Sequence, residues 1–103
     1  SEMYREITER FGELYMVDAD FTMTPVRKRE LQERLFVEKA IPDFPYGVAH
    51  VSYMDGCKVY FDNGGWVVCR FSGTEPLLRT CAEMPDEKDA AACVEIWRVF
   101  LGL

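Results

Sequence analysis

Residues 48–83, VAHVSYMDGCKVYFDNGGWVVCRFSGTEPLLRTCAE, decide the fold of this chain. Apolar and polar residues alternate along much of the stretch, which is typical of β-strands that bury one face. Asp55-Gly56 predicts a two-residue hairpin, and the glycine-rich residues 63–65 predict a second turn. We therefore expect an antiparallel meander of four strands, at residues 48–54, 57–61, 66–71 and 77–83.

A helix is predicted on each side of the meander. Thr24 is suited to cap a helix that begins with Pro25, and the prolines at 42 and 45 are expected to end it. The residues of this helix expected in the core are Val26, Leu31, Leu35 and Phe36. Asp86 is suited to cap the last helix. Its expected packing stripe consists of Ala90, Cys93, Val94, Trp97, Phe100 and Leu101.

Two more elements are predicted before Thr24. Apolar residues three or four apart predict an amphipathic helix over residues 1–14. Alternation then predicts an extended segment over residues 15–21, with Asp18 and Asp20 as exposed polar positions. The order helix, strand, helix, four strands, helix predicts an α+β fold in which helices pack on an antiparallel sheet.

The composition is that of a folded globular domain. The chain has 103 residues, 49% of them hydrophobic and 14% aromatic, which is enough for one core and leaves no room for a second. The formal net charge is −6, so we expect neither nucleic acid nor an anionic membrane as a partner. No apolar run approaches the roughly 20 residues that span a bilayer. The small size and the initial serine suggest part of a longer protein.

Four cysteines lie at positions 57, 69, 81 and 93. The sequence has no C-x-x-C pair, and His50 is its one histidine, so the spacing of a zinc site is missing. We predict free, mostly buried thiols in a cytoplasmic protein. His50 is interpreted as a structural or surface residue, and Trp66 and Trp97 as core aromatics.

The helix predicted to begin at Pro25 carries many charges. They include the run Arg27-Lys28-Arg29, but glutamates follow closely and dilute its positive charge. Glu30 and Arg34 are spaced for a favourable i, i+4 pair. We interpret these residues as a solvated helix face.

The connection between the third and fourth predicted strands differs from an ordinary turn. It reads RFSGTEPLLR from Arg70 to Arg79. Because the two arginines flank a hairpin, we expect their guanidinium groups to come close, where they repel unless an anion lies between them. Ser72 and Thr74 add hydroxyl donors, and Gly73 permits a turn whose amides converge. This set of donors suits a phosphate group.

A second interpretation of the loop needs no ligand. Glu75 would pair with one of the arginines, and Ser-Gly-Thr would simply be a turn, with Pro76 fixing its exit. The residue types alone leave both interpretations open.

The same loop resembles the final domain of the α-D-phosphohexomutases, the family of phosphoglucomutases and phosphomannomutases. The resemblance is carried by the motif R-x-S-G-T-E-P-x-x-R at residues 70–79, with Trp66 before it and Ala82-Glu83 after it. It is strong over residues 55–83 and weaker over residues 23–50. It implies the α+β fold of that domain, which is like that of the TATA-box-binding protein.

The resemblance also implies a place within a larger enzyme. Residues 1–22 would be a linker helix and strand from the preceding domain, and residues 23–103 the C-terminal phosphate-binding domain. In such enzymes four domains line one cleft, where a phosphoserine exchanges a phosphoryl group with a hexose phosphate. Magnesium held by the second domain assists, and the fourth domain grips the phosphate that is not reacting.

By matching positions, that grip would consist of Arg70, Ser72, Gly73, Thr74 and Arg79, with Glu75 supporting the loop. The implied partners are a hexose phosphate (glucose or mannose 1- or 6-phosphate, or the bisphosphate) and the other three domains of the parent chain. The family's phosphoserine loop, magnesium loop and sugar-recognition loop do not occur in this sequence. We therefore expect no catalytic residue and no metal ligand in it, and no activity from the chain alone.

Two other interpretations stay open. Phosphoglucosamine mutases share the Ser-Gly-Thr-Glu-Pro core, although the residues around this loop are more like those of the glucose and mannose branch. A free-standing phosphate-binding or interaction module, with no enzyme around it, would also account for the loop.

Overall fold

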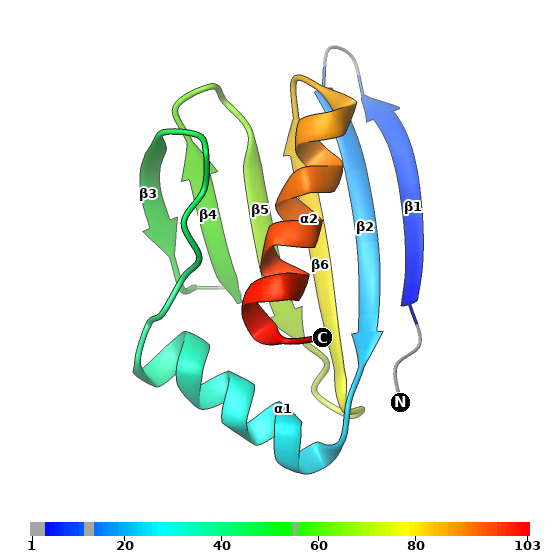
Figure 1. Cartoon of the computed structure of the whole chain (residues 1–103), viewed down its shortest axis with the longest axis vertical. Helices are drawn as coiled ribbons and strands as arrows, with labels where there is room; N and C mark the ends of the chain where they lie inside the picture. The colour runs from blue at the N-terminus through cyan, green and yellow to red at the C-terminus, as the bar shows by residue number, and fades with distance from the viewer. Residues whose placement is uncertain (1–3, 12–13, 55) are drawn as a thin grey trace.

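The computed structural model describes residues 4–11, 14–54 and 56–103, the first of these ranges by its backbone alone. Within these residues one antiparallel sheet has six strands in the order β1-β2-β6-β5-β4-β3, with helices against it (Figure 1). The predicted α+β class is confirmed, with six strands in place of four. The elements are β1 (Tyr4–Phe11), β2 (Leu14–Thr22), α1 (Pro25–Gln32), a π-helical segment (Glu33–Val37), β3 (Val48–Ser52), β4 (Cys57–Phe61), β5 (Trp66–Phe71), β6 (Leu77–Met84) and α2 (Glu87–Leu101).

The meander of β3, β4, β5 and β6 follows the prediction, and each strand pairs with the next in antiparallel register. The first hairpin was predicted too tight. β3 ends at Ser52 and β4 begins at Cys57, so four residues join them instead of two. The Ser52 hydroxyl accepts from the Met54 amide at 3.4 Å, and such a local bond competes with the strand ladder. Asp55 of the predicted turn lies outside the described residues.

The prediction of a helix over residues 1–14 is wrong for the part of it that the structure describes. Residues 4–11 form β1, which pairs with β2 in continuous antiparallel register from Tyr4 opposite Phe21 to Phe11 opposite Leu14. Tyr, Ile, Thr and Phe in this segment favour strands. Pairing with the edge of β2 therefore outweighs an apolar spacing that also suits a helix. Residues 1–3 and 12–13 lie outside the described part.

The helix after Thr24 begins as predicted. Thr24 Oγ1 accepts from the Arg27 amide at 3.1 Å, and Pro25 takes the first position. Leu31 and Leu35 are buried as expected, but Val26 is 57% exposed. Five residues along a helix rotate a side chain by roughly 140°, which turns Val26 away from the face of Leu31. Helical structure ends at residue 37, before the prolines that were expected to stop it.

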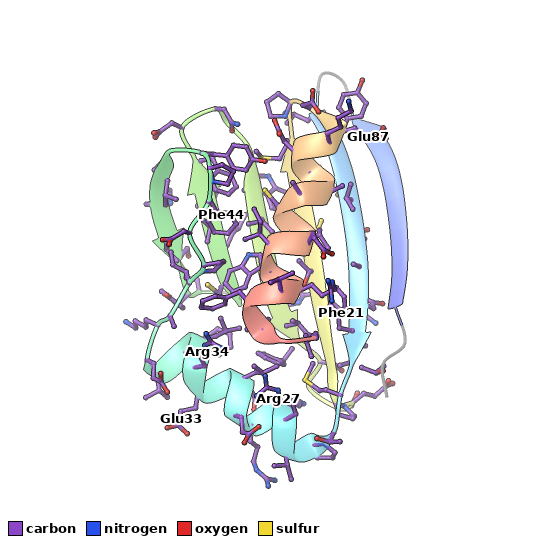
Figure 2. The ribbon with its side chains drawn as sticks, in the orientation of Figure 1. Phe21, Arg27, Glu33, Arg34, Phe44 and Glu87 are labelled. Carbon is purple, nitrogen blue, oxygen red and sulfur yellow. The ribbon has the colours of Figure 1, made fainter. Side chains whose placement is uncertain are left out.

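Two arginines of this helical segment contact the end of α2, so its charged face is only partly solvated. Arg27 Nη2 donates to the Leu101 carbonyl at 2.7 Å, and Arg34 Nη1 donates to the Phe100 carbonyl at 3.1 Å. Figure 2 shows both arginines on the side of this segment toward α2. Cations at a helix C-terminus stabilise it. Glu30 pairs with Arg27 at 3.4 Å, and the predicted Glu30–Arg34 pair is not formed.

The last helix closes the core from one side of the sheet. Asp86 caps α2 by accepting from the Lys88 amide at 2.8 Å, as predicted. α2 crosses β2, β5 and β6 (Figure 1). All of its predicted stripe is buried except Phe100, which is half-buried. Trp97 is a core residue as predicted, whereas Trp66 is half-buried. Trp66 lies on the opposite face because its neighbour Val67 points inward.

The face of the sheet that turns away from α2 carries polar and aromatic side chains. His50 is exposed and stacks on Tyr60, with ring centroids 4.3 Å apart, which fits its predicted surface role. The Lys58 ammonium lies 4.2 Å from the Trp66 ring centroid. This uncovered face is called the outer face below.

The strand β2 lies inside the same sheet and supplies the buried residues Val17, Ala19 and Phe21. The proposed division between residues 1–22 and residues 23–103 stays a prediction. The four cysteines are free thiols, with three buried and Cys81 half-buried, as predicted. Within the described residues, none of the helices is both long and apolar enough to pass through a bilayer.

Candidate functional site

The two arginines of the predicted site are brought together by strand pairing. Arg70 on β5 lies directly opposite Arg79 on β6, and opposed residues of antiparallel strands have Cα atoms about 5 Å apart. Both side chains are exposed. Their flanking residues Cys69 and Leu78 point into the core, so alternation along the strands places both guanidinium groups on the outer face.

Like charges directly opposite each other destabilise a strand pair, and Arg70 also has a further interaction within the chain. On the other side of β6, Asp20 of β2 lies opposite Arg79. The row Asp20, Arg79, Arg70 therefore has one negative and two positive charges. An anion placed over the two arginines would be attracted by both and partly repelled by Asp20.

The loop of residues 72–76 is closed by its own backbone. The Ser72 amide donates to the Leu77 carbonyl at 2.9 Å, and the Leu77 amide donates to the Glu75 carbonyl at 2.8 Å. At the exit, the Pro76 carbonyl accepts from the Met23 amide at 3.0 Å. These bonds fix the two ends of the loop and leave residues 73 and 74 at its tip.

The Ser72 hydroxyl organises the tip. Ser72 Oγ accepts from the amides of Thr74 and Glu75, each at 3.3 Å. The sequence led us to expect these amides to converge on a ligand, and the structure instead directs them at this hydroxyl. Because a hydroxyl has two lone pairs and one hydrogen, Ser72 is left as a donor. Its oxygen lies 3.5 Å from Thr74 Oγ1, so two hydroxyl groups gather at the tip.

Gly73 lies in open space. A Cβ atom at this position would meet nothing within 4 Å. Its amide has no acceptor among the residues that the structure describes. The loop therefore offers one backbone donor and two hydroxyl groups beside a pair of guanidinium groups.

Glu75 contributes its backbone to the loop. Its side chain is exposed and forms no ion pair with any residue in the described ranges. The alternative in which Glu75 neutralises an arginine is therefore not the arrangement of this structure. The backbone carbonyl of Glu75 accepts from Lys28 Nζ at 3.2 Å.

Lys28 is the residue of this region that sequence reasoning missed. Its ammonium also donates to the Ser72 carbonyl, at 2.7 Å, so α1 holds the loop at two points. The signal in the sequence was the basic run at residues 27–29, which we interpreted as a solvated face. Because the contact joins residues 44 positions apart, no local pattern distinguishes Lys28 from its basic neighbours.

An aromatic pair supports the strand that enters the loop. Phe71 is half-buried, and its ring lies 6.1 Å from that of Phe36 in an edge-to-face arrangement. The Phe36 ring also meets Tyr53 at 6.3 Å. The inward side of the loop entrance is thus packed while its outward side carries Arg70.

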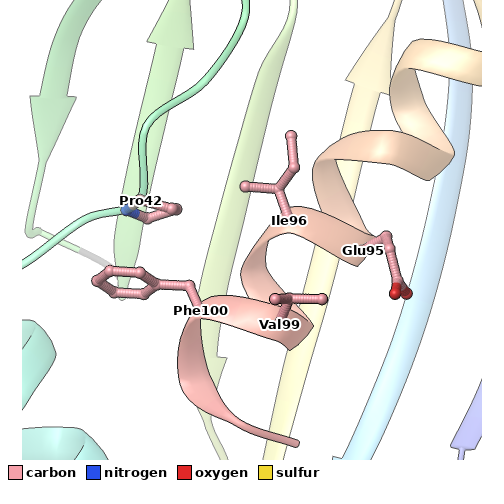
Figure 3. Close-up of a pocket in the computed structure, with 5 residues that line it drawn as sticks. All are labelled: Pro42, Glu95, Ile96, Val99 and Phe100. Atoms are coloured by element: carbon pink, nitrogen blue, oxygen red, sulfur yellow. The ribbon is translucent and has the colours of Figure 1, made fainter.

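A separate hollow of about 370 Å³ lies beside α2 (Figure 3). Its lining is Pro42, Glu95, Ile96, Val99 and Phe100. Its one charged lining residue, Glu95, is paired with Arg98, and that contact lowers the pKa of the carboxyl. The hollow therefore lacks the donors that a phosphate requires.

Within the described residues, no three His, Cys, Asp or Glu side chains gather in a way that would hold a metal ion. Asp18 and Asp20 are half-buried on the outer face of β2. The magnesium that the resemblance implies for a parent enzyme stays a prediction about residues beyond this site.

The fold and the loop together define an α+β domain with a cluster of cationic and hydroxyl donors at one end of its sheet. Residues 26–97 match the family described as Phosphoglucomutase/phosphomannomutase, C-terminal domain. The chain belongs to this family. A protein of Thermococcus kodakarensis named Phosphoglucomutase/phosphomannomutase is 45% identical over 42 residues, which are 41% of this chain and 9% of that protein.

Proposed function

We propose that this chain is the C-terminal domain of a phosphohexomutase and that its β5–β6 loop binds the phosphate of a hexose phosphate. The donors are Arg70, Ser72, Gly73, Thr74 and Arg79. The observation that carries the proposal is the direct pairing of Arg70 with Arg79 on the outer face, at the base of a loop rich in hydroxyl groups. Family membership supports the same assignment.

The chemical role of this grip is to hold the end of the sugar that does not react. Binding energy gained at a remote phosphate orients the reacting oxygen and so contributes to the rate. Each charge-assisted hydrogen bond contributes roughly 1.5–3 kcal/mol. Hydroxyl groups rotate, and a guanidinium group can bind two phosphate oxygens at once. The same donors can therefore bind a phosphate at either end of the hexose.

Turnover requires the rest of a parent chain. The segment matched in the relative is a small part of that protein, and we assign the reacting phosphoserine and the magnesium to the other three domains. On its own, the chain interconverts no hexose phosphates. We place it in the cytoplasm, where free thiols such as its own persist. The name of the relative favours glucose and mannose phosphates over glucosamine phosphate.

The proposal is tested by titrating the chain with glucose 6-phosphate and glucose 1-phosphate while recording backbone amide NMR spectra. Glucose without phosphate is the ligand control. The test variant is R70Q/R79Q, and the matched control is R29Q/K88Q, which also removes two positive charges from exposed positions.

We expect both sugar phosphates to shift amides within residues 70–79 of the wild-type chain and of R29Q/K88Q, at micromolar to millimolar concentration. R70Q/R79Q loses these shifts while its spectrum stays that of a folded protein. Equal shifts in both variants, or shifts confined to other elements, contradict the proposal. A mutase assay on the purified chain checks the second part, because turnover would contradict the assignment of catalysis to other domains.

A further inference from the structure

Lys28 approaches the loop from the side of α1, while the paired arginines lie on the outer face. Its ammonium donates to the carbonyls of Ser72 at 2.7 Å and Glu75 at 3.2 Å. These two carbonyls flank the tip formed by Gly73 and Thr74. One side chain thus holds the loop on both sides of its most exposed residues.

The bond to Ser72 determines where the next amide points. In a trans peptide the carbonyl of one residue and the N–H of the following residue point in opposite directions, and this chain has no cis peptide among its described residues. Because the Ser72 carbonyl is directed at Lys28, the Gly73 N–H is directed away from α1. That amide has no acceptor among the described residues, and a Cβ atom on Gly73 would meet nothing within 4 Å.

The bond also changes the strength of this donor. A carbonyl that accepts from a cation is polarised, and polarisation of one hydrogen bond strengthens the next in a chain of bonds. The Gly73 N–H belongs to the same peptide group as the Ser72 carbonyl. It should therefore be a better donor to an anion than an amide whose carbonyl faces water.

The position of Lys28 is itself well fixed. It lies in the first turn of α1, which is capped by Thr24 and whose Leu31 is buried in the core. The amide of Met23, just before the cap, donates to the Pro76 carbonyl. The beginning of α1 and the loop therefore meet at both Lys28 and Met23, so the helix acts as a rigid support.

We propose that Lys28 is a positioning residue of the phosphate site, which turns the Gly73 amide toward a bound phosphate without touching the ligand. This inference rests on the proposed function of the loop. A lysine that only tethers the loop would affect stability alone, whereas a positioning residue sets the direction of one N–H bond and through it the affinity for phosphate.

The test compares K28M, K28R and the neighbouring control R29M. R29M removes a positive charge from an exposed position of the same helix turn, and the Arg29 side chain forms no hydrogen bond or ion pair with the described residues of the loop. Residual dipolar coupling of the Gly73 N–H measures its direction in the free chain. Titration with glucose 6-phosphate measures affinity, and thermal unfolding measures stability.

We expect K28M to change the Gly73 coupling and to weaken binding by roughly tenfold, the effect of losing one oriented charge-assisted donor. K28R keeps a cation able to reach both carbonyls and stays within about threefold of the wild type. R29M leaves the coupling and the affinity unchanged.

The outcomes separate this inference from the proposed function. If the wild-type chain binds phosphate and K28M binds equally well, Lys28 is not a positioning residue and the phosphate site still stands. If the wild-type chain binds no phosphate, the proposed function fails, and the Gly73 coupling still decides whether Lys28 orients the amide. An unchanged coupling in K28M, or equal losses in K28M and K28R, overturns the inference.

Discussion

The two connections at the ends of β5 both contain glycine, but they differ in what holds them and in the space around them. The β4–β5 turn is closed by hydrogen bonds between its own residues. The Gly65 amide donates to Asn63 Oδ1 at 2.8 Å, and the Phe61 amide donates to the Gly65 carbonyl at 2.9 Å. The β5–β6 loop is held from outside by Lys28. Bonds of its own backbone and of the Ser72 hydroxyl also close it, but its Gly73 amide has no acceptor among the described residues.

The space around the two glycines makes the same distinction. A Cβ atom on Gly65 would lie 2.3 Å from Met84 Sδ and 2.8 Å from the Glu83 carbonyl oxygen. A Cβ atom on Gly73 would meet nothing within 4 Å. The first connection is packed against the fold, and the second leaves room for a ligand. The difference teaches that packing, more than the presence of glycine, separates a turn fixed against the fold from a loop that a ligand could reach.

The largest effect is expected on phosphate affinity, at the β5–β6 loop. Arg79→Gln removes one of the paired guanidinium groups and should lower the affinity for glucose 6-phosphate by roughly tenfold to hundredfold. Because it also removes a like-charge neighbour of Arg70, the free energy of unfolding should stay within about 0.5 kcal/mol. Titration and urea unfolding measure the two quantities. A loss of stability with unchanged affinity would show that Arg79 stabilises the fold and does not bind the phosphate.

A change in the β4–β5 turn should have the opposite effect, lowering stability and leaving phosphate affinity unchanged. Gly65→Ala places a methyl group against Met84 and the β6 backbone, so we expect a loss of about 1–3 kcal/mol of unfolding free energy. Phosphate affinity should not change. Gly73→Ala is the control for stability and should stay within about 0.5 kcal/mol of the wild type. Equal destabilisation by both changes would show that the two connections are packed alike.

Alkaline pH offers a test of the buried thiols in the core. Burial raises the pKa of Cys57 from 9.0 to about 11 and that of Cys93 to about 12. The unfolded chain therefore loses these protons first. Their contribution to stability is complete below pH 9, the value of the exposed thiol, and is lost as pH rises through the folded pKa values.

We therefore expect the free energy of unfolding to fall between about pH 8 and about pH 10.5, and to fall less steeply in Cys57→Ala. Urea unfolding at the two pH values measures this difference. If the variant and the wild type have the same pH dependence, then Cys57 is not kept protonated by its surroundings.

The smallest effect concerns the negative end of the charged row. Asp20 lies opposite Arg79, so Asp20→Asn should raise phosphate affinity by about twofold at low salt, and less at higher ionic strength. Titrations at two salt concentrations measure the change. Weaker binding by this variant would mean that Asp20 holds Arg79 in place for the ligand.

Much of the fold could be predicted because its signals are local. The strands β4, β5 and β6, the Thr24 and Asp86 caps and the stripe of α2 each follow from spacing and capping chemistry within a few residues. The helix predicted over residues 1–14 was wrong for its described residues because β1 pairs with β2, and an apolar spacing in eight residues suits either structure. Trp66 was misplaced because its type, and not its alternation with Val67, guided the prediction.

The candidate site divides in the same way. The pairing of Arg70 with Arg79 could be predicted because a hairpin joins them. The contact of Lys28 with the loop could not, since it depends on how α1 packs after the core forms. The direction of the Thr74 and Glu75 amides toward Ser72 Oγ was also missed, because the composition of a turn does not fix its peptide planes.

The central claim is that Arg70 and Arg79 together receive one phosphate, and the NMR signals of their side-chain Nε–H groups test it most directly. On titration with glucose 6-phosphate, both signals should shift with one shared dissociation constant, while that of Arg29 stays in place. Signals of Arg70 and Arg79 that do not move, or that move at different concentrations, would contradict the claim.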